Sequence, residues 1–363
     1  MLIGIDANEA NIKNRVGIGC YAYNLLRGVY DLNEKNKNAH QFLIYLKSPP
    51  LPQLPGPSPN WQYRVLRPSF LWSQLALPIH LIRASNRPQL LFTTSHYLPF
   101  ISTIASIVSI MDLSYLHYPK LFKFSDLYKL KNWTAASIRK AKKIITISHF
   151  SKREIIKYYF IDPARIVVAY PGVDRDLYKP KKLHGKKDFI LYVGTLQPRK
   201  NIKGLIKAYS LSQNLDKLRL VIAGAKGWLY HDIFTEVKNR GLVGKIIFSE
   251  YVSEKELISF YQNAVCLVLP SFYEGFGIPV IEAFACGCPV IASNSSSLPE
   301  IVGNAGLLID PNQPASIATA IDSVCSDQHL RQSLIKKGLI RSKSFNWENP
   351  TKILYTTLTE TAI

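Results

Sequence analysis

The sequence predicts an α/β protein made of two domains of similar size, each with a parallel β-sheet. Three observations support this prediction. The chain has 363 residues, which is long for a single hydrophobic core. Short apolar runs alternate with segments of helical periodicity, as expected of parallel layers. A second alternating series begins at Phe189, after a basic stretch at residues 178–187 that we expect to be a linker.

In the first half, apolar runs of strand length alternate with longer segments of helical periodicity. The predicted strands are residues 2–6, 42–46, 90–94, 107–111, 144–147 and 166–169. The predicted helices are residues 20–31, 72–84, 126–142 and 150–159. Six prolines between Pro49 and Pro59 exclude regular structure there and predict a loop.

The second half repeats this pattern. The predicted strands are residues 189–193, 218–223, 246–248, 265–269 and 290–292. After Asp310, helices are expected at residues 315–325 and 327–342, and a third begins near residue 347. The two series fit two Rossmann-like domains, at residues 1–178 and 179–345, followed by a C-terminal helix at residues 346–363.

Composition indicates a globular chain in a reducing compartment. Apolar residues make up 47% of the sequence. The five cysteines lack metal-ligand spacing and several lie in apolar runs, so we expect buried thiols. The chain starts directly on a predicted strand, without a basic leader, and contains no run of about 18 apolar residues. We therefore expect neither a secretion signal nor a membrane span, and a cytoplasmic location.

The net charge of +20 is concentrated in the first half, where residues 1–180 carry 24 Lys and Arg against 10 Asp and Glu. Residues 120–157 alone carry 11 basic and 2 acidic residues, interleaved with aromatic side chains. An anionic membrane surface or a lipid-phosphate acceptor would explain this excess. Nucleic acid could use the same charge, and a solvated helical face is a third explanation.

The most informative segment is residues 271–291, SFYEGFGIPVIEAFACGCPVI. Glu274 and Glu282 lie eight residues apart around a glycine-rich turn that follows a predicted buried strand. Pro279 suits the start of a helix, so Gly275 and Gly277 would place backbone N–H groups at a helix N-terminus, which favours an anion. We expect Glu282, in the first helical turn, to face the same crevice. A nucleotide diphosphate fits these groups.

Two other loops could contact the same ligand. In LYVGTLQPRKN, Gly194 permits close backbone approach, and Arg199 with Lys200 can neutralise a departing diphosphate. Near the N-terminus, Gly17 and Gly19 open a helix after the first strand. A basic surface loop and a plain turn, respectively, remain alternatives for these two segments.

These motifs resemble those of the retaining glycosyltransferases of family four. The resemblance covers nearly the whole chain and is strongest at residues 192–311. It implies the GT-B fold, in which two Rossmann-like domains face a central cleft and the last helix crosses back to the N-terminal domain. It also implies that Glu274 contacts the transferred sugar and that Glu282 binds the nucleotide ribose.

The resemblance further implies that Arg199 and Lys200 grip the donor diphosphate in place of a metal. The glycine loop near the N-terminus would approach the donor phosphates and the reacting sugar. The donor-binding residues expected from the family pattern, besides Glu282, are Gly17, Gly19, Gly194, Gly275, Phe276, Gly277 and Ile278. No cofactor and no metal are expected.

Three features depart from the family pattern or compete with it. Met111 stands where relatives have an active-site His, although the following Asp112 remains and is our fourth catalytic candidate, beside Glu274, Arg199 and Lys200. His117 lies six residues further on, and whether it substitutes stays open. Cys20 stands where an Arg is frequent. Asp174 and Asp176 form a DxD pattern, but their turn-rich setting predicts a turn rather than a metal site.

The predicted function is transfer of a hexose, with retention, from a nucleotide diphosphate sugar to a growing lipid-linked glycan. The family resemblance suggests mannose from GDP-mannose as the donor. The partners would include this acceptor and an anionic surface on the inner face of the membrane, but no nucleic acid. The alternatives are a sugar-nucleotide 2-epimerase of the same fold, a catalytically weakened GT-B partner protein and, from charge alone, a nucleic-acid binder.

Overall fold

A computed structural model describes residues 1–181, 188–250 and 252–362. The chain divides into two compact units, which we call unit 1 (Met1–Pro171 with Trp347–Ile363) and unit 2 (Gly172–Asn346). The observed division comes before the boundary that we expected after residue 178, because the turn after Pro171 belongs to unit 2. In this turn the Val173 N–H donates to the Phe345 carbonyl at 3.1 Å. Part of the expected linker, residues 182–187, lies outside the described residues.

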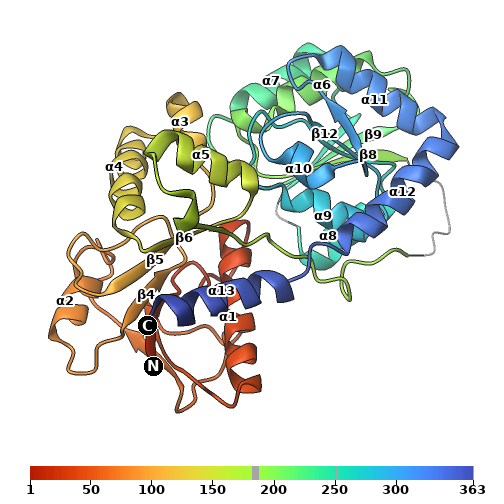
Figure 1. The fold of residues 1–363 in the computed structure, drawn as a ribbon. Coiled ribbons are helices and arrows are strands. Elements are labelled where there is room, and N and C mark those ends of the chain that lie inside the picture. The colour runs from red at the N-terminus through yellow and green to blue at the C-terminus, as the bar shows by residue number, and fades with distance from the viewer. Residues whose placement is uncertain (182–187, 251, 363) are drawn as a thin grey trace. The chain divides into compact units, whose positions relative to one another are not determined.

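Unit 1 contains a seven-stranded, wholly parallel sheet in the order β3-β2-β1-β4-β5-β6-β7. Figure 1 labels its neighbouring strands β4, β5 and β6. The strands are β1 (Leu2–Asp6), β2 (Gln41–Leu46), β3 (Trp61–Val65), β4 (Leu90–Thr93), β5 (Ala105–Ile110), β6 (Lys143–Thr146) and β7 (Ile166–Val168). The order reverses between β1 and β4, so a crevice is expected beyond the carboxyl ends of these two strands.

Helices cover both faces of this sheet. They are α1 (Ile18–Lys35), α2 (Ala76–Arg83), α3 (Ser114–His117), α4 (Phe124–Lys140), α5 (His149–Tyr159) and α13 (Glu348–Thr361), with short 3-10 turns at Pro119–Leu121 and Pro163–Arg165. One buried cluster joins α1 and α13 to the sheet, and a second joins α2, α4 and α5. The last helix packs closely on α1, since a Cβ on Gly28 would lie 2.2 Å from Thr351 Oγ1.

Unit 2 has a six-stranded parallel sheet in the order β10-β9-β8-β11-β12-β13. Its strands are β8 (Phe189–Val193), β9 (Arg219–Ala223), β10 (Ile246–Ser249), β11 (Leu267–Leu269), β12 (Val290–Ser293) and β13 (Leu307–Ile309). Its helices are α6 (Ile202–Leu211), α7 (His231–Asn239), α8 (Glu254–Asn263), α9 (Ile278–Ala285), α10 (Leu298–Val302), α11 (Pro314–Ser326) and α12 (Gln328–Ser342), with a 3-10 turn at Pro198–Lys200. Here the order reverses between β8 and β11.

The predicted α/β class with two parallel sheets is confirmed, but three details were wrong. The strands β3 and β13 were missed because both are sheet edges with partly exposed residues and weak hydrophobic patterns. The strand predicted from residue 265 begins only at Leu267, because α8 runs to Asn263. Cys20 and Cys325 are only partly buried, whereas the other three thiols are buried as expected.

Among the described residues, no helix has both the length and the hydropathy needed to cross a bilayer.

Candidate active site

The predicted diphosphate-binding residues meet at the switch point of the unit 2 sheet. The strands β8 and β11 are neighbours, with Leu191 opposite Leu267, so the loops that follow them leave the sheet side by side. The loop after β8 carries Arg199 and Lys200, and the loop after β11 carries Glu274. Ligands of open parallel sheets bind beyond the carboxyl ends of the strands at such a point.

Asn201 fixes the first loop in place. It is buried, has a φ of 55°, and donates from its side-chain amide to the carbonyls of Pro270 at 3.1 Å and Pro311 at 2.7 Å. Asn tolerates this left-handed backbone better than most residues. The two bonds tie the end of the Arg199–Lys200 turn to the loops after β11 and β13, so the two cations are held on a rigid base.

Glu274 is the centre of a charged cluster. Lys200 Nζ lies 2.5 Å from Glu274 Oε1, and Arg199 Nη1 lies 3.5 Å from Oε2. The Ser271 hydroxyl donates to Oε1 at 2.7 Å, and Arg199 also donates to the Tyr273 carbonyl at 2.8 Å. The side chains of the two cations are only 15% and 13% exposed, so this cluster is largely removed from water.

The cluster keeps Glu274 ionised. Burial by itself raises the pKa of this carboxyl, but Lys200 and Arg199 attract the charged form, and the hydrogen bonds from Lys200 and Ser271 add to this effect. The resulting pKa is below the ordinary value for Glu. Two cations surround one anion, so the cluster carries a net positive charge in a nearly dry place.

Three serines after β12 hold the Glu274 loop, and the sequence analysis missed them. Ser296 Oγ accepts the Glu274 N–H at 2.9 Å, and Ser297 Oγ donates to the carbonyls of Glu274 at 2.9 Å and Phe276 at 3.0 Å. Ser295 Oγ donates to the Ser271 carbonyl at 3.2 Å. A run of serines directly after a buried strand was the available signal, because such residues satisfy loop backbone groups.

The glycine-rich turn leads into α9 as predicted, with Gly277 as its N-cap and proline in its first turn. Gly277 has a φ of 101°, and a Cβ there would lie 2.7 Å from Leu298 Cδ2, so a side chain would be strained and crowded. Phe276 does not offer its ring to a ligand, because the ring is buried against Phe345, with 5.7 Å between centroids. The predicted role of Phe276 therefore reduces to its backbone. Ile278 is half-buried at the helix start.

Glu282 lies in the second turn of α9 rather than the first, because the helix begins at Ile278. Its Oε2 accepts the hydroxyl of Tyr261, which is fully buried, at 2.8 Å. Burial raises the pKa of Glu282 to about 7, and the negative charge of Glu254 contributes in the same direction. This carboxyl therefore changes between its neutral and charged forms near neutral pH, where a bound ligand can alter its protonation.

Gly194 permits a close approach, as predicted, but the observed partner is the backbone after β9. A Cβ on Gly224 would lie 2.1 Å from the Gly194 carbonyl oxygen, so the loops after β8 and β9 pack without side chains between them. This contact brings the start of the Arg199 loop close to the sheet.

The corresponding switch point of unit 1 is more open. Gly17 is the N-cap of α1 and has a φ of 50°, with no atom within 4 Å of a Cβ built there. Gly19 is buried, and a Cβ would lie 3.3 Å from the Glu9 carbonyl oxygen, so the glycine loop packs on the segment after β1. Asp6, the last residue of β1, precedes that segment. Burial raises the pKa of its carboxyl to about 6, although hydrogen bonds from the backbone and side chain of Asn8 act in the opposite direction.

His96, which the sequence analysis missed, contacts Met111. It follows β4, and its Nε2 accepts the Met111 N–H at 3.1 Å. Burial lowers the pKa of this imidazole, while the nearby Asp112 carboxylate acts in the opposite direction. Asp112 accepts the Ser114 N–H at 2.9 Å. A His directly after a buried strand was the signal that could have identified this residue.

His117, for which the sequence left a substituting role open, contacts a carboxylate of another helix. It lies on α3, and its Nε2 pairs with the Glu154 carboxylate of α5. The DxD pattern forms the predicted turn, in which Asp174 accepts the N–H groups of Asp176 and Leu177 at 2.9 and 3.3 Å. Within residues 1–181, 188–250 and 252–362, no group of three or more His, Cys, Asp or Glu has a metal-binding arrangement.

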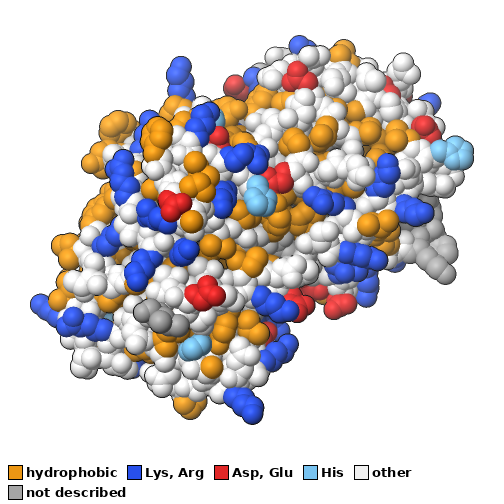
Figure 2. Space-filling view, viewed as in Figure 1, with side chains coloured by type: hydrophobic (Ala, Val, Ile, Leu, Met, Phe, Trp, Pro, Cys, Tyr) orange, Lys and Arg blue, Asp and Glu red, His pale blue; other side chains and the backbone are white. Residues whose placement is uncertain are grey.

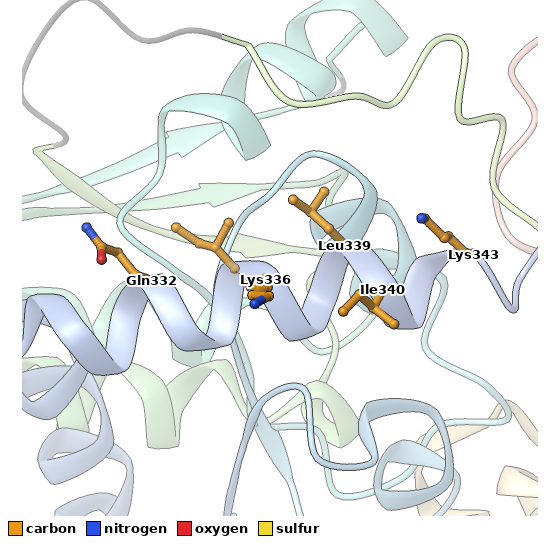
Figure 3. Close-up of a pocket in the computed structure, with 6 residues that line it drawn as sticks. Gln332, Lys336, Leu339, Ile340 and Lys343 are labelled. Atoms are coloured by element: carbon orange, nitrogen blue, oxygen red, sulfur yellow. The ribbon is translucent and has the colours of Figure 1, made fainter.

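A shallow cavity of about 400 Å³ lies on α12 (Figure 3). Five of the lining residues belong to this helix and the sixth is its C-cap; they are Gln332, Ile335, Lys336, Leu339, Ile340 and Lys343. None of the predicted site residues lines it. Its lining contains no carboxylate and none of the residues that meet around Glu274, so it is not the candidate site.

Comparison with known proteins identifies the family. The group 1 glycosyl transferase model matches residues 174–341, and the Glycosyltransferase Family 4 model matches residues 31–177. An O-antigen chain mannosyltransferase B of Escherichia coli is 35% identical over 260 residues, which cover 68% of this chain and 68% of that protein. The chain belongs to glycosyltransferase family 4.

Other comparisons agree. The O-antigen chain mannosyltransferase RfbU of Salmonella typhimurium is 32% identical to this family 4 enzyme over 257 residues, 69% of this chain and 68% of that one. A solved sucrose-phosphate synthase from Thermosynechococcus elongatus superposes with a TM-score of 0.79 at 19% identity, over 99% of this chain and 98% of the other. The predicted GT-B fold class and a glycosyltransferase that depends on nucleotide sugars are thereby confirmed.

Proposed function

We propose that this enzyme transfers mannose from GDP-mannose, with retention of configuration, to a growing lipid-linked glycan. In this proposal unit 2 binds the donor and unit 1 binds the acceptor. The observation that carries it is the buried cluster of Arg199, Lys200 and Glu274 beyond the ends of β8 and β11. A site with net positive charge at a helix-flanked switch point suits a nucleotide diphosphate.

The two cations would act on the leaving group. When the glycosidic bond to the diphosphate breaks, negative charge accumulates on the phosphate oxygen that departs. Arg199 and Lys200 are desolvated and pre-positioned, so their attraction for that charge is stronger than in water and needs no reorganisation during the reaction. This arrangement would supply, from side chains, the stabilisation that other transferases obtain from a divalent cation.

Glu274 would have two successive roles. Without donor, its carboxylate neutralises part of the charge of Lys200 and Arg199 and keeps both side chains in place. A bound diphosphate offers the cations a second anion. Their shift toward the phosphates would leave the carboxylate oxygens available to hydroxyls of the transferred sugar. Asp112, Gly17 and Gly19 would contribute from unit 1.

Glu282 would bind the nucleotide ribose. The ionised carboxylate accepts hydrogen bonds from both ribose hydroxyls, and Tyr261 keeps one of its oxygens oriented. Because the pKa of Glu282 is about 7, bound ribose would favour the charged form and displace the proton.

The names of the relatives support mannose as the sugar and a surface polysaccharide as the product, since two of them are O-antigen chain mannosyltransferases. A glycan assembled on a lipid at the inner face of the cell membrane is the acceptor that we propose. The high positive charge of residues 1–180 suits such an anionic surface.

A donor screen tests the proposal. GDP-mannose should raise the melting temperature more than UDP-glucose, UDP-galactose or UDP-N-acetylglucosamine, because only a ligand of the folded state stabilises it. In EDTA, mannose should then pass from GDP-mannose to a lipid-linked acceptor, with an α-linked product by NMR. Conversion of the nucleotide sugar without acceptor would favour the epimerase. A requirement for Mg²⁺ or Mn²⁺ would contradict the role of the two cations.

A further inference from the structure

A second surface of unit 1 has a composition that the donor and acceptor sites do not explain. The segment after β3, the helix α2 and the loop after β4 expose six large apolar side chains, which we call the α2 face. They are Phe70, Leu71, Ile79, Ile82, Phe100 and Ile101. Their exposed fractions run from 44% at Ile82 to 68% at Ile101. Contiguous exposed apolar residues on this scale mark an interaction surface.

Hydrogen bonds show that the two halves of the α2 face are adjacent. Gln74, which precedes α2, donates to the Leu98 carbonyl at 3.0 Å and accepts the Phe100 N–H at 2.9 Å. On the other side, Lys140 of α4 donates to the carbonyls of Pro99 and Phe100, both at 2.9 Å. The Phe100 ring packs edge-on against Trp133 of α4, with 5.5 Å between ring centroids. The face is therefore continuous with α4.

The charge around the α2 face indicates which kind of partner it binds. No Asp or Glu occurs between Glu34 and Asp112, whereas seven Lys and Arg lie in residues 35–111. The adjoining α4 carries four basic residues and a single acidic residue, Asp126. Figure 2 shows apolar side chains over the part of unit 1 where Figure 1 places α2 and α4, with Lys and Arg side chains between them. Positive charge around an apolar patch complements an anionic lipid surface.

We propose that the α2 face docks on an anionic lipid bilayer, with Ile79, Ile82, Phe100 and Ile101 entering the interface. Ile79 and Ile82 project from the outer side of α2, while Leu77 and Leu81 of the same helix are buried. The helix is thus apolar on both sides, which suits an element between a protein core and acyl chains. Arg and Lys around the face would contact lipid phosphates.

The position of the α2 face suits a lipid-linked acceptor, and to this extent the inference rests on the proposed function. Residues 66–75 follow the carboxyl end of β3, and residues 94–104 follow that of β4. His96 and Asp112 lie at the same edge of the sheet, after β4 and β5. Residues 94–104 then run on to the start of β5, so the α2 face extends along the side of the sheet. A bilayer against this face would lie nearest the edge with His96 and Asp112 at Phe70 and Leu71, which follow β3.

Vesicle co-sedimentation tests the docking without donor or acceptor. The parent should bind vesicles of phosphatidylcholine mixed with phosphatidylglycerol and should bind pure phosphatidylcholine more weakly. The double variant Ile79→Gln with Ile82→Gln should bind the mixed vesicles at least about tenfold more weakly, since two aliphatic side chains no longer enter the interface. The matched control is Leu211→Gln with Leu308→Gln, two positions of unit 2 that are 53% and 42% exposed, and it should bind like the parent.

Unchanged vesicle binding of the α2 double variant, with its melting temperature intact, would overturn the docking. A parent that sediments as a dimer and a variant that sediments as a monomer would assign the face to a second copy of the chain instead. Donor titration and transfer to a soluble acceptor should be equal in parent and variant. A parent that binds anionic vesicles but neither binds the donor nor transfers the sugar would contradict the proposed function and leave the docking standing.

Discussion

At the switch point of unit 2, two cations surround one buried carboxylate, whereas at the switch point of unit 1 an open glycine loop faces single polar groups. Both points lie beyond the carboxyl ends of two neighbouring parallel strands, β8 and β11 in unit 2 and β1 and β4 in unit 1. At the switch point of unit 2, Arg199 and Lys200 each form an ion pair with Glu274, at 3.5 and 2.5 Å. Unit 1 places Gly17, His96 and Asp112 around its point.

The difference matches what each unit is proposed to bind. A diphosphate is small and highly charged, and a compact cluster of buried cations recognises it. A glycan acceptor offers many neutral hydroxyls, and recognition then spreads over separate hydrogen-bonding groups and an adjacent surface. We infer that one side chain of the unit 2 cluster matters far more to the reaction than any one side chain in unit 1.

The largest expected effect comes from removing a cation of the cluster. Lys200→Ala should lower turnover on the order of 10²- to 10³-fold, because a pre-positioned group that stabilises departing negative charge is lost. Arg199→Ala should behave similarly. Initial rates with GDP-mannose in EDTA, measured beside the melting temperature, check this.

The matched control is Lys203→Ala. Lys203 belongs to the helix that follows the same loop, but its side chain is 51% exposed and pairs with the exposed Asp232. Turnover of this variant should equal that of the parent. An equal loss in Lys203→Ala and Lys200→Ala would mean that general positive charge, not the buried cluster, acts on the donor.

A smaller effect is expected at Glu282. Glu282→Gln should weaken GDP-mannose binding on the order of 1–3 kcal/mol, since a carboxylate that accepts two ribose hydroxyls becomes an amide that accepts fewer. Calorimetric titration measures this. Unchanged affinity would exclude contact between Glu282 and the ribose.

The pH dependence of stability and of donor affinity gives a second test of the contact between Glu282 and the ribose. The folded-state pKa of Glu282 is about 7 against an ordinary 4.5, so the native state retains a proton through this interval. Its stabilising contribution is complete below pH about 4.5 and is lost as the pH rises through about 7. Affinity for GDP-mannose should change in the opposite sense and rise through pH about 7, because the ligand prefers the carboxylate.

Two variants control the titration. Glu282→Gln should show no such rise. Glu254→Gln should move the rise to lower pH, because the negative charge of Glu254 contributes to the raised pKa of Glu282. If the affinity for GDP-mannose rose equally and at the same pH in all three proteins, the rise would belong to a group other than Glu282.

The smallest effect is expected in unit 1. His96→Ala removes the acceptor of the Met111 N–H and should lower the free energy of unfolding on the order of 1 kcal/mol. His96→Gln, whose side-chain carbonyl can accept the same N–H, should recover most of this loss. Urea denaturation measures both. Equal destabilisation by the two substitutions would exclude the bond to Met111 as the cause.

The sequence predicted the local parts of the donor site and not the contacts between them. The strand, glycine turn and proline of residues 271–291 follow from short-range rules, and β8 and β1 were placed at their observed bounds. The ion pair between Lys200 and Glu274 joins residues 74 positions apart, and only the strand order brings them together. The same holds for Ser296 and Tyr261, which support the two glutamates from other elements.

In unit 1 the missed features have weak local patterns. The edge strand β3 buries Trp61 but leaves most of its other residues accessible, so its alternation is faint. The α2 face also escaped prediction, because apolar residues of a short helix are normally assigned to a core. Only the exposed fractions of Ile79 and Ile82 show that part of this helix faces outward.

The central claim is that Glu274 shares its two cations with the donor diphosphate. Titration of GDP into the parent and into Glu274→Gln, in EDTA, tests it most directly when mannosyl transfer is measured on the same preparations. The variant should have a lower melting temperature that GDP restores, should bind GDP at least as tightly as the parent, and should lose transfer at least about 100-fold. Loss of GDP binding together with transfer, or transfer at the parent rate, would contradict the claim.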